Sequence, residues 1–172
     1  NQILYASSGS GSFSHLAIAL LTAMTKTQMT HIPYKGGGPA TTAIVAGETQ
    51  FLVGSPAAVV TQLEAKRLRL LAVTSPTRAA LFPDVPAMAE MLPGYDSRGW
   101  FGYLAPAGTP AKIVALLNAE INRALNAPEI REKLEATGLT VLNESPEAFA
   151  KTLREDYDIY GKLIKTIGLQ PQ

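Results

Sequence analysis

The chain has 172 residues, 47% of them hydrophobic, with a formal net charge of +1 and no Cys. Its length and hydrophobicity indicate a globular protein with a buried core rather than a disordered one. Balanced charge without a long basic run argues against nucleic acid as a partner, and the lack of Cys excludes disulfides, iron–sulfur clusters and thiolate zinc sites. No segment approaches the roughly 20 apolar residues of a membrane span, and the chain begins without signal-peptide features, so we expect a soluble chain.

Short apolar runs alternate with small-residue turns and amphipathic segments over the first 75 residues. The pattern predicts strands at 3–6, 29–33, 50–53 and 68–74, and helices at 13–25, 40–46 and 57–65. The fourth strand is apolar at nearly every position, which is typical of a strand covered on both faces. This β-α-β-α-β-α-β series predicts an α/β fold with a parallel sheet, right-handed crossovers and helices on both faces.

The second half has a different pattern, beginning with a proline-interrupted stretch that contains one short helix at 87–91. An aromatic strand is expected at 99–105, followed by a helix with Thr109 as its N-cap and Pro110 at its first position. A further helix begins at Pro128, a short strand covers 139–142, and a last helix runs from the Ser145-Pro146-Glu147 cap to about residue 167. We place a boundary between residues 96 and 99.

Charge is scarce in the first third of the chain. Residues 1–50 carry only Lys26, Lys35 and Glu48. If this region binds an anion, it must use backbone dipoles where other proteins use Lys or Arg.

The first candidate site is the loop SSGSGSFSH at residues 7–15, between the first strand and the first helix. Glycines allow close approach of the backbone to a ligand, and the N–H groups of a helix start carry about half a positive charge. Such a loop can bind a carboxylate. It lacks the third glycine and the acidic residue of a dinucleotide fingerprint, and the Lys of a P-loop. The alternative is an ordinary turn whose serines only cap the helix.

Two further loops follow the next strands in the same position. One is YKGGGP at residues 34–39, and the other is Gly54-Ser55-Pro56. Loops that leave the carboxyl ends of parallel strands meet at one edge of the sheet, where open α/β sheets bind ligands. We therefore expect the three loops to form one site, although a flexible turn without function is the alternative for the glycine run.

Catalysis has little support. An acyl hydrolase could pair Ser12 or Ser14 with His15, but GSFSH is not the G-x-S-x-G elbow. His31 lies in an apolar strand and is interpreted as a hydrogen-bonded core residue. No pair of carboxylates occurs in the glycine-rich half, so no catalytic residue, metal site or cofactor is predicted there.

Several blocks of the chain resemble the Bug family, the extracytoplasmic solute-binding receptors of tripartite tricarboxylate transporters. They are YASSGSGSFSHL, HIPYKGGGPA, LRLLAVTS, FPDVPAMAE, PGYDSRGWFGYLAPAGTP and a final IGLQP. The resemblance extends over essentially the whole chain, with the blocks in family order. It implies a receptor, not an enzyme, with the α/β fold of type II periplasmic binding proteins.

The resemblance also implies a division of the chain. Residues 4–97 correspond to the second ligand-binding lobe, and residues 98–172 to the returning C-terminal segment of the first lobe. Family chains are nearly twice as long, so the amino-terminal half is absent here, as in a truncated chain, a proteolytic fragment or a partial gene product.

Matching the family's loops residue by residue implies a set of ligand-binding residues. They are Ser8, Gly9, Ser10, Gly11, Ser12 and His15 in the first loop, Tyr34, Lys35, Gly36 and Gly37 in the second, and Ser55 in the third. Many relatives have Asp or Asn where this chain has Gly54-Ser55. The difference favours carboxylate ligands without an amino group.

The implied ligand is a small organic carboxylate, which the receptor delivers to the permease subunits of a transporter. A periplasmic location and hinge closure near Tyr5 and residues 96–99 follow from the same resemblance. Two alternatives are the hydrolase described above and a fragment that binds no ligand and forms a homodimer through its exposed surface.

Overall fold

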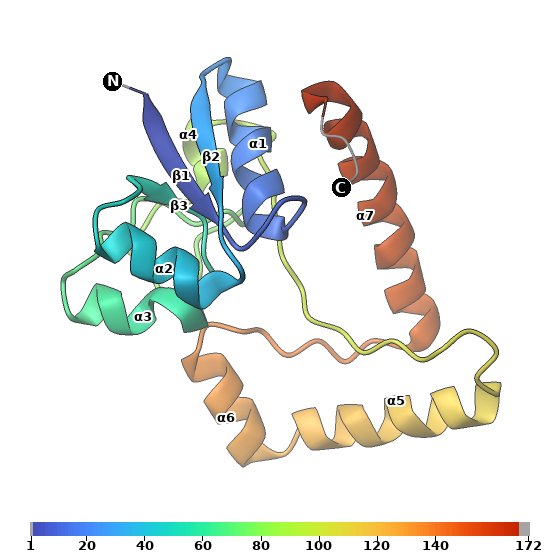
Figure 1. Cartoon of the computed structure of the whole chain (residues 1–172). Helices are drawn as coiled ribbons and strands as arrows, with labels where there is room; N and C mark the ends of the chain where they lie inside the picture. Colours follow the sequence, from blue (N-terminus) through green and yellow to red (C-terminus); the bar gives the residue numbers. More distant parts are fainter. Residues whose placement is uncertain (1, 169–172) are drawn as a thin grey trace. The chain divides into compact units, whose positions relative to one another are not determined.

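The computed structural model describes residues 2–168 and divides the chain into two compact units (Figure 1). The first unit consists of the chain up to Gly99 together with the residues from Leu163 onward, and the second is Trp100–Lys162. The end of the IGLQP motif lies outside the described residues.

The first unit contains a parallel sheet of three strands in the order β2-β1-β3. The strands are β1 (Ile3–Ser7), β2 (Met29–Pro33) and β3 (Phe51–Leu52). In the register, Tyr5 of the central strand lies opposite His31 on one side and Phe51 on the other. The first three predicted strands are confirmed, with β3 shorter than expected.

Strand order determines where the helices pack. The connection from β1 to β2 and the connection from β2 to β3 run in opposite directions across the sheet, so right-handed crossovers place α1 and α2 on opposite faces. Figure 1 shows α1 (Phe13–Thr25) on one side, and α2 (Gly37–Val45) together with α3 (Pro56–Glu64) on the other. The predicted arrangement of helices on both faces is confirmed.

The core of this unit is built largely from small residues, because alanines let helices approach the sheet closely. Buried side chains come from β1, α1, α2 and the segment after residue 86; they are Tyr5, Ala6, Leu16, Ala17, Ile18, Ala19, Ala40, Ala43, Ala87 and Tyr95. Tyr95 is 1% exposed and its hydroxyl donates to the backbone oxygen of Ala17 at 3.0 Å. This bond ties the end of the first unit to α1.

The predicted fourth strand at 68–74 is wrong. Only Val73 pairs there, in an isolated parallel bridge to Ala87. The N–H of Val73 donates to Pro86, and the N–H of Met88 donates to Val73. The next bond of a parallel ladder would need an N–H from Pro86, which proline lacks, and at Met88 the helix α4 (Met88–Met91) begins. The bridge therefore cannot extend in either direction.

The second unit is helical, with α5 (Ala111–Leu125), α6 (Pro128–Ala136) and the greater part of α7 (Pro146–Ile167). The predicted starts at Pro128 and after Ser145 are confirmed. The predicted start of α5 is wrong by one residue, since Pro110 is the N-cap and the hydroxyl of Thr109 donates to Pro106 at 2.8 Å.

Two strands predicted in the second unit are also absent from the described residues. Neither 99–105 nor 139–142 is paired with another strand, and a strand needs such a neighbour to satisfy its backbone groups. The aromatic stretch is instead solvent-exposed, with Phe101 82% and Tyr103 78% exposed. The 143–144 segment is tied to α5 by side-chain amides, including that of Asn118, which donates to the oxygen of Glu144 at 2.9 Å.

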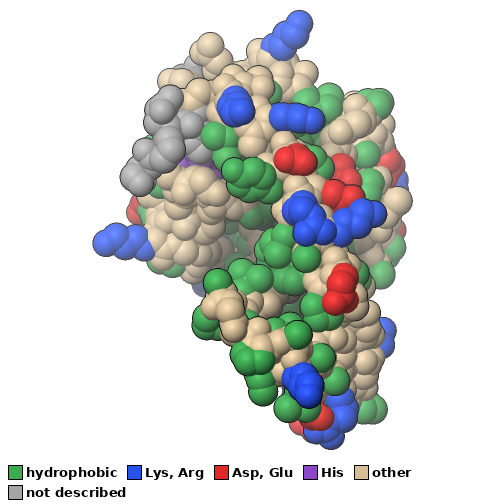
Figure 2. Space-filling model, turned by 90° about the vertical axis from the view of Figure 1, so that its right-hand side faces the viewer, with side chains coloured by type: hydrophobic (Ala, Val, Ile, Leu, Met, Phe, Trp, Pro, Cys, Tyr) green, Lys and Arg blue, Asp and Glu red, His purple; other side chains and the backbone are tan. Residues whose placement is uncertain are grey.

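The surface carries dispersed charges among exposed hydrophobic side chains (Figure 2). Three leucine or isoleucine side chains of the α5 apolar stripe, Ile113, Leu116 and Leu117, are exposed. None of the described helices combines the length and hydrophobicity needed to cross a bilayer.

Candidate functional site

The three predicted loops meet at one edge of the sheet. The N–H of Tyr34 donates to Ser7 at 3.0 Å, and the N–H of Gly36 donates to Ser8 at 3.1 Å, so the second loop is bonded to the first. A Cβ atom on Gly37 would lie 3.9 Å from the Cβ of Ala58, so the starts of α2 and α3 are neighbours. The prediction that the loops come together is confirmed.

The strand order makes this edge a natural ligand-binding position. β1 and β3 are adjacent, but the loop after β1 leads to α1 on one face and the loop after β3 leads to α3 on the other. A crevice forms at the carboxyl ends of strands whose connections diverge in this way.

Serine hydroxyls form a directed network in the first loop. The hydroxyl of Ser12 donates to the carbonyl of Gly9 at 2.7 Å, so in the 3.0 Å contact between Ser12 and Ser14, Ser14 must donate. Ser14 Oγ in turn accepts the N–H of Ser8 at 2.9 Å and lies 3.1 Å from the Ser8 hydroxyl. Ser14 is buried and joins both ends of the loop.

This network employs most of the amides that the sequence predicted as ligand donors. The N–H of Gly9 donates to Ser7 Oγ at 3.2 Å, that of Gly11 to His15 Nδ1 at 3.0 Å, and that of Ser12 to the carbonyl of Gly9 at 3.2 Å. With Ser8 bonded to Ser14, these amides shape the loop in this structure. The Ser8 hydroxyl in this network is half-buried and contacts Ser14 Oγ at 3.1 Å.

The starts of α2 and α3 lack side-chain caps. Gly36, the N-cap of α2, has no side chain, and the Ser55 side chain makes no cap hydrogen bond to α3. Pro39 and Pro56 have no N–H, and the N–H of Ala58 donates to the Ser55 carbonyl at 3.0 Å. The first-turn N–H groups that remain as donors to an anion are therefore those of Gly37 and Gly38 in α2 and of Ala57 in α3. The sequence signal is the combination of GGGP and GSP, which places glycine or an unused serine before each helix.

Other predicted site residues lie differently. The hydroxyl of Tyr34 donates to Glu48 at 3.1 Å. Loss of solvent around the hydroxyl is the larger cause that raises the Tyr34 pKa, and the bond to Glu48 is the second. Lys35 and Ser10 are exposed, and Gly37 is the first residue of α2. His15 is only 6% exposed and packs beneath the loop.

The hydrolase alternative is wrong. His15 Nδ1 accepts the backbone N–H of Gly11, and Ser14 is bonded to other serines and to Ser8 N–H, so no serine–imidazole pair forms from Ser12 or Ser14 with His15. The serine that does contact an imidazole is Ser7, whose Oγ lies 2.6 Å from His31 Nε2. Ser7 is fully buried and cannot reach a substrate. His31 is hydrogen-bonded, as predicted.

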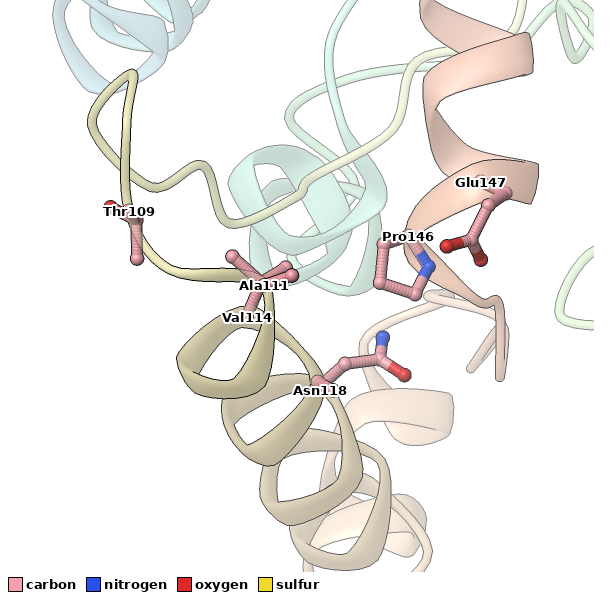
Figure 3. A pocket seen from close by; sticks show the side chains of 7 residues that line it. Thr109, Ala111, Val114, Asn118, Pro146 and Glu147 are labelled. Carbon is pink, nitrogen blue, oxygen red and sulfur yellow. The ribbon is translucent and has the colours of Figure 1, made fainter.

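A separate pocket of about 470 Å³ lies in the second unit, between the starts of α5 and α7 (Figure 3). It is lined by Thr109, Ala111, Val114, Ala115, Asn118, Pro146 and Glu147. Hydrogen bonds from its own backbone N–H and from Ser145 lower the Glu147 pKa, so this wall carries a negative charge. The pocket is therefore unsuited to an anion. Among the described residues, no three His, Asp or Glu side chains gather as metal ligands.

The first unit is an α/β unit in which two helices begin without side-chain caps at the carboxyl edge of a parallel sheet. The family model described as "Tripartite tricarboxylate transporter family receptor" matches residues 1–169. The chain belongs to this family, and the resemblance to Bug receptors is confirmed. Its members are solute-binding receptors, not enzymes.

Two curated relatives illustrate the match. A protein from the tcbD–tcbE intergenic region of Pseudomonas sp. strain P51 is 39% identical over 165 residues, covering 95% of this chain and 49% of the relative. Protein BugT of Bordetella pertussis is 32% identical over 168 residues, covering 97% and 52%. The chain spans about half the length of these relatives.

Solved structures share the fold. Rhodopseudomonas palustris Rpa4515 with adipate superposes with a TM-score of 0.90 at 32% identity, covering all of this chain and 58% of that one. The periplasmic binding protein BugD gives 0.90 at 28% identity, with 99% and 58% covered. MatC from the same Rhodopseudomonas species, with bound malate, gives 0.88 at 31%, with 94% and 56% covered. The predicted fold of a periplasmic-binding-protein lobe is confirmed.

Proposed function

We propose that this chain carries the second ligand-binding lobe of a receptor for small organic carboxylates, built from residues 4–97. The observation that carries the proposal is that α1, α2 and α3 all begin at the same edge of the sheet, where Lys and Arg side chains are scarce. Two relatives of the same fold were solved with adipate and with malate, both dicarboxylates. A carboxylate is the anion that uncapped N–H groups and a serine hydroxyl can hold.

In this proposal each loop has a role. The N–H groups of Gly37 and Gly38 in α2 and of Ala57 in α3, which follow Gly36 and Ser55, donate to the carboxylate. The Ser8 hydroxyl turns from Ser14 to the ligand. The remaining residues of the first loop, from Gly9 to Ser12, provide its shape. Lys35, which is exposed, adds the positive charge of the second loop.

Residues 98–172 are proposed to be the returning segment of the first lobe. Support comes from relatives about twice as long and from the grouping of Trp100–Lys162 as a separate unit, while the residues from Leu163 onward group with the first unit. The complete receptor would close about a hinge near Tyr5 and residues 96–99, reside in the periplasm, and deliver its ligand to a membrane permease. Homodimer formation by this chain stays a prediction that sedimentation velocity tests.

A thermal-shift screen tests the proposal directly. Adipate, malate, succinate, citrate, aspartate and glutamate are each added to the chain at increasing concentration, with acetamide as an uncharged control. A ligand at 100 times its dissociation constant stabilises the folded state by about 2.7 kcal/mol. Saturable stabilisation by plain dicarboxylates supports the proposal.

The same screen tests ligand selectivity. Gly54-Ser55 supplies no carboxylate for an ammonium group, so plain dicarboxylates should bind more tightly than aspartate or glutamate. Stronger binding of the amino acids would overturn this part of the proposal. If no carboxylate stabilises either this chain or a longer chain with both lobes, carboxylate binding itself is refuted.

A further inference from the structure

His15 acts on the first loop through one ring nitrogen. The backbone N–H of Gly11 points at His15 Nδ1 across 3.0 Å. A backbone N–H can only donate, so Nδ1 must be unprotonated and the imidazole is neutral, with its proton on Nε2. The sequence assigned His15 to the ligand, but the ring lies beneath the loop with 6% of the residue exposed.

The ring is held in a stack that fixes its position. Its centroid lies 3.9 Å from that of His31 with the planes 11° apart, and His31 stacks in turn on Tyr5 at 4.9 Å. The middle ring of the stack is anchored by the 2.6 Å contact between His31 Nε2 and Ser7 Oγ. His31 of β2, supported by Tyr5 and Ser7 of β1, thus holds the His15 acceptor in place.

Gly11 lies in a turn that is closed by two bonds from Ser12, since the N–H and the hydroxyl of Ser12 both donate to the Gly9 carbonyl. Gly11 has φ +73°, and no atom lies within 4 Å of the position a Cβ would take there. The hydrogen bond to His15 holds the Gly11 N–H itself, while the bonds from Ser12 close the turn around it.

We propose that neutral His15 is a positioning residue that orders the first loop for ligand by accepting the N–H of Gly11, and that protonation of its ring releases the loop. This inference rests on the proposed carboxylate site. A proton on Nδ1 converts this nitrogen from an acceptor into a donor. Two N–H groups, that of Gly11 and that of Nδ1, then face each other and cannot form a hydrogen bond. Protonation also places a cation 3.9 Å from the His31 ring centroid.

The groups that face His15 limit where this transition falls. Burial lowers the pKa of His15 below its usual 6.5, and burial together with His15 lowers the pKa of His31 to about 4. Burial raises the pKa of Tyr5 to about 12, so the third member of the stack stays neutral. Both imidazoles are therefore neutral above pH 6.5, and they become protonated only at lower pH than a free imidazole.

The test compares three chains between pH 8 and pH 5. His15→Asn places an amide oxygen near the Nδ1 position, where it accepts an N–H and does not titrate. His31→Gln keeps a polar group near Ser7 and removes the second imidazole. Calorimetry gives the dissociation constant for adipate, and NMR follows the Gly11 amide and the His15 ring nitrogens without ligand.

Wild type should lose about tenfold or more in affinity on acidification, with the Gly11 amide signal shifting at the pKa of His15. His15→Asn should keep only the smaller pH dependence that protonation of adipate itself produces near pH 5, and His31→Gln should keep the full wild-type dependence. The inference is overturned if His15→Asn keeps the wild-type pH slope, or if His15 titrates without any change at Gly11.

The experiment separates failure of the proposed carboxylate site from failure of the positioning role of His15. If adipate does not bind at pH 8, the carboxylate site is in doubt, but the ligand-free NMR titration still decides whether His15 controls Gly11. If His15→Asn does not fold, the His15 and Gly11 signals of the wild-type chain answer the same question. A Gly11 amide that is insensitive to pH then refutes the positioning role.

Discussion

The Ser8 N–H donates to the Ser14 hydroxyl oxygen at 2.9 Å, and this bond connects the start of the first loop to the first turn of α1. Ser14 also contacts the Ser8 and Ser12 hydroxyls at 3.1 and 3.0 Å. One buried serine therefore holds together a loop whose other members were assigned to the ligand.

Ser14→Ala should destabilise the chain and weaken carboxylate binding together. The substitution leaves the Ser8 N–H without its acceptor, which should lower the free energy of unfolding by about 1–3 kcal/mol. Loss of loop order should reduce affinity for a dicarboxylate about tenfold, or about 1.4 kcal/mol. Urea denaturation and calorimetry measure the two effects.

Ser75→Ala is the matched control, because the Ser75 hydroxyl donates to Thr77 at 2.7 Å within another loop. It should leave affinity unchanged. Equal loss of affinity in both variants would show that Ser14 has no special place in the site.

Two neighbouring glycines at the start of α2 should respond oppositely to alanine. Gly36 has φ 105° and ψ 172°, a conformation essentially restricted to glycine, so Gly36→Ala should cost about 1–3 kcal/mol of stability. Gly38 has no positive φ and open space around its Cβ position, so Gly38→Ala should stabilise by about 0.4–1 kcal/mol. Urea midpoints at constant m-value provide the comparison, and destabilisation by both variants would contradict the assigned backbone conformation.

Tyr95→Phe should remove the bond to the Ala17 backbone oxygen while retaining the buried ring. The expected loss is about 0.5–1.5 kcal/mol of unfolding free energy. Tyr157→Phe removes a hydroxyl from a residue that is 81% exposed and should change stability by less than about 0.5 kcal/mol. Thermal unfolding of the two variants measures the difference, and a neutral Tyr95→Phe would argue against a contribution of this bond.

Stability should fall as the pH is lowered from 6.5 toward 4. The pKa values of His15 and His31 are lower in the folded chain than in the unfolded chain, where they are near 6.5. Above pH 6.5 both rings are neutral in both states and their contribution to stability is fully present. Below it the unfolded chain binds protons that the folded chain does not, so unfolding becomes more favourable.

Urea midpoints measured at half-unit pH intervals give this slope, and His31→Gln should flatten it. The Arg78–Glu90 ion pair does not explain a loss of stability between pH 6.5 and pH 4. Bonds from Arg78 and from the backbone of Ala87 lower the Glu90 pKa to about 2, so its contribution is lost only as the pH falls from about 4.5 toward 2. A pH-independent midpoint between 6.5 and 4 would contradict the burial of neutral imidazoles.

Local sequence predicted the features that depend on neighbouring residues. Apolar periodicity and turn residues identified β1, α1, β2, α2 and α3, because caps and hydrophobic faces are encoded within a few positions. The same logic predicted that three loops meet at one edge, since parallel strands direct their carboxyl ends the same way. The expected strands at 68–74, 99–105 and 139–142 failed because pairing needs a partner that a sequence window does not contain.

The sequence by itself determined the class of fold, the family and the position of the glycine-serine loops at the ends of the strands. Only the tertiary structure decided which groups in those loops are already occupied. The fold of the loop brings Ser14 within hydrogen-bond distance of both Ser8 and Ser12. It also directs the Gly11 N–H to His15 Nδ1. The stacking of two histidines 16 positions apart in sequence required β2 to pair beside β1 and α1 to pack across them. It placed His15 beneath the loop, where we propose that it supports the loop instead of contacting the ligand.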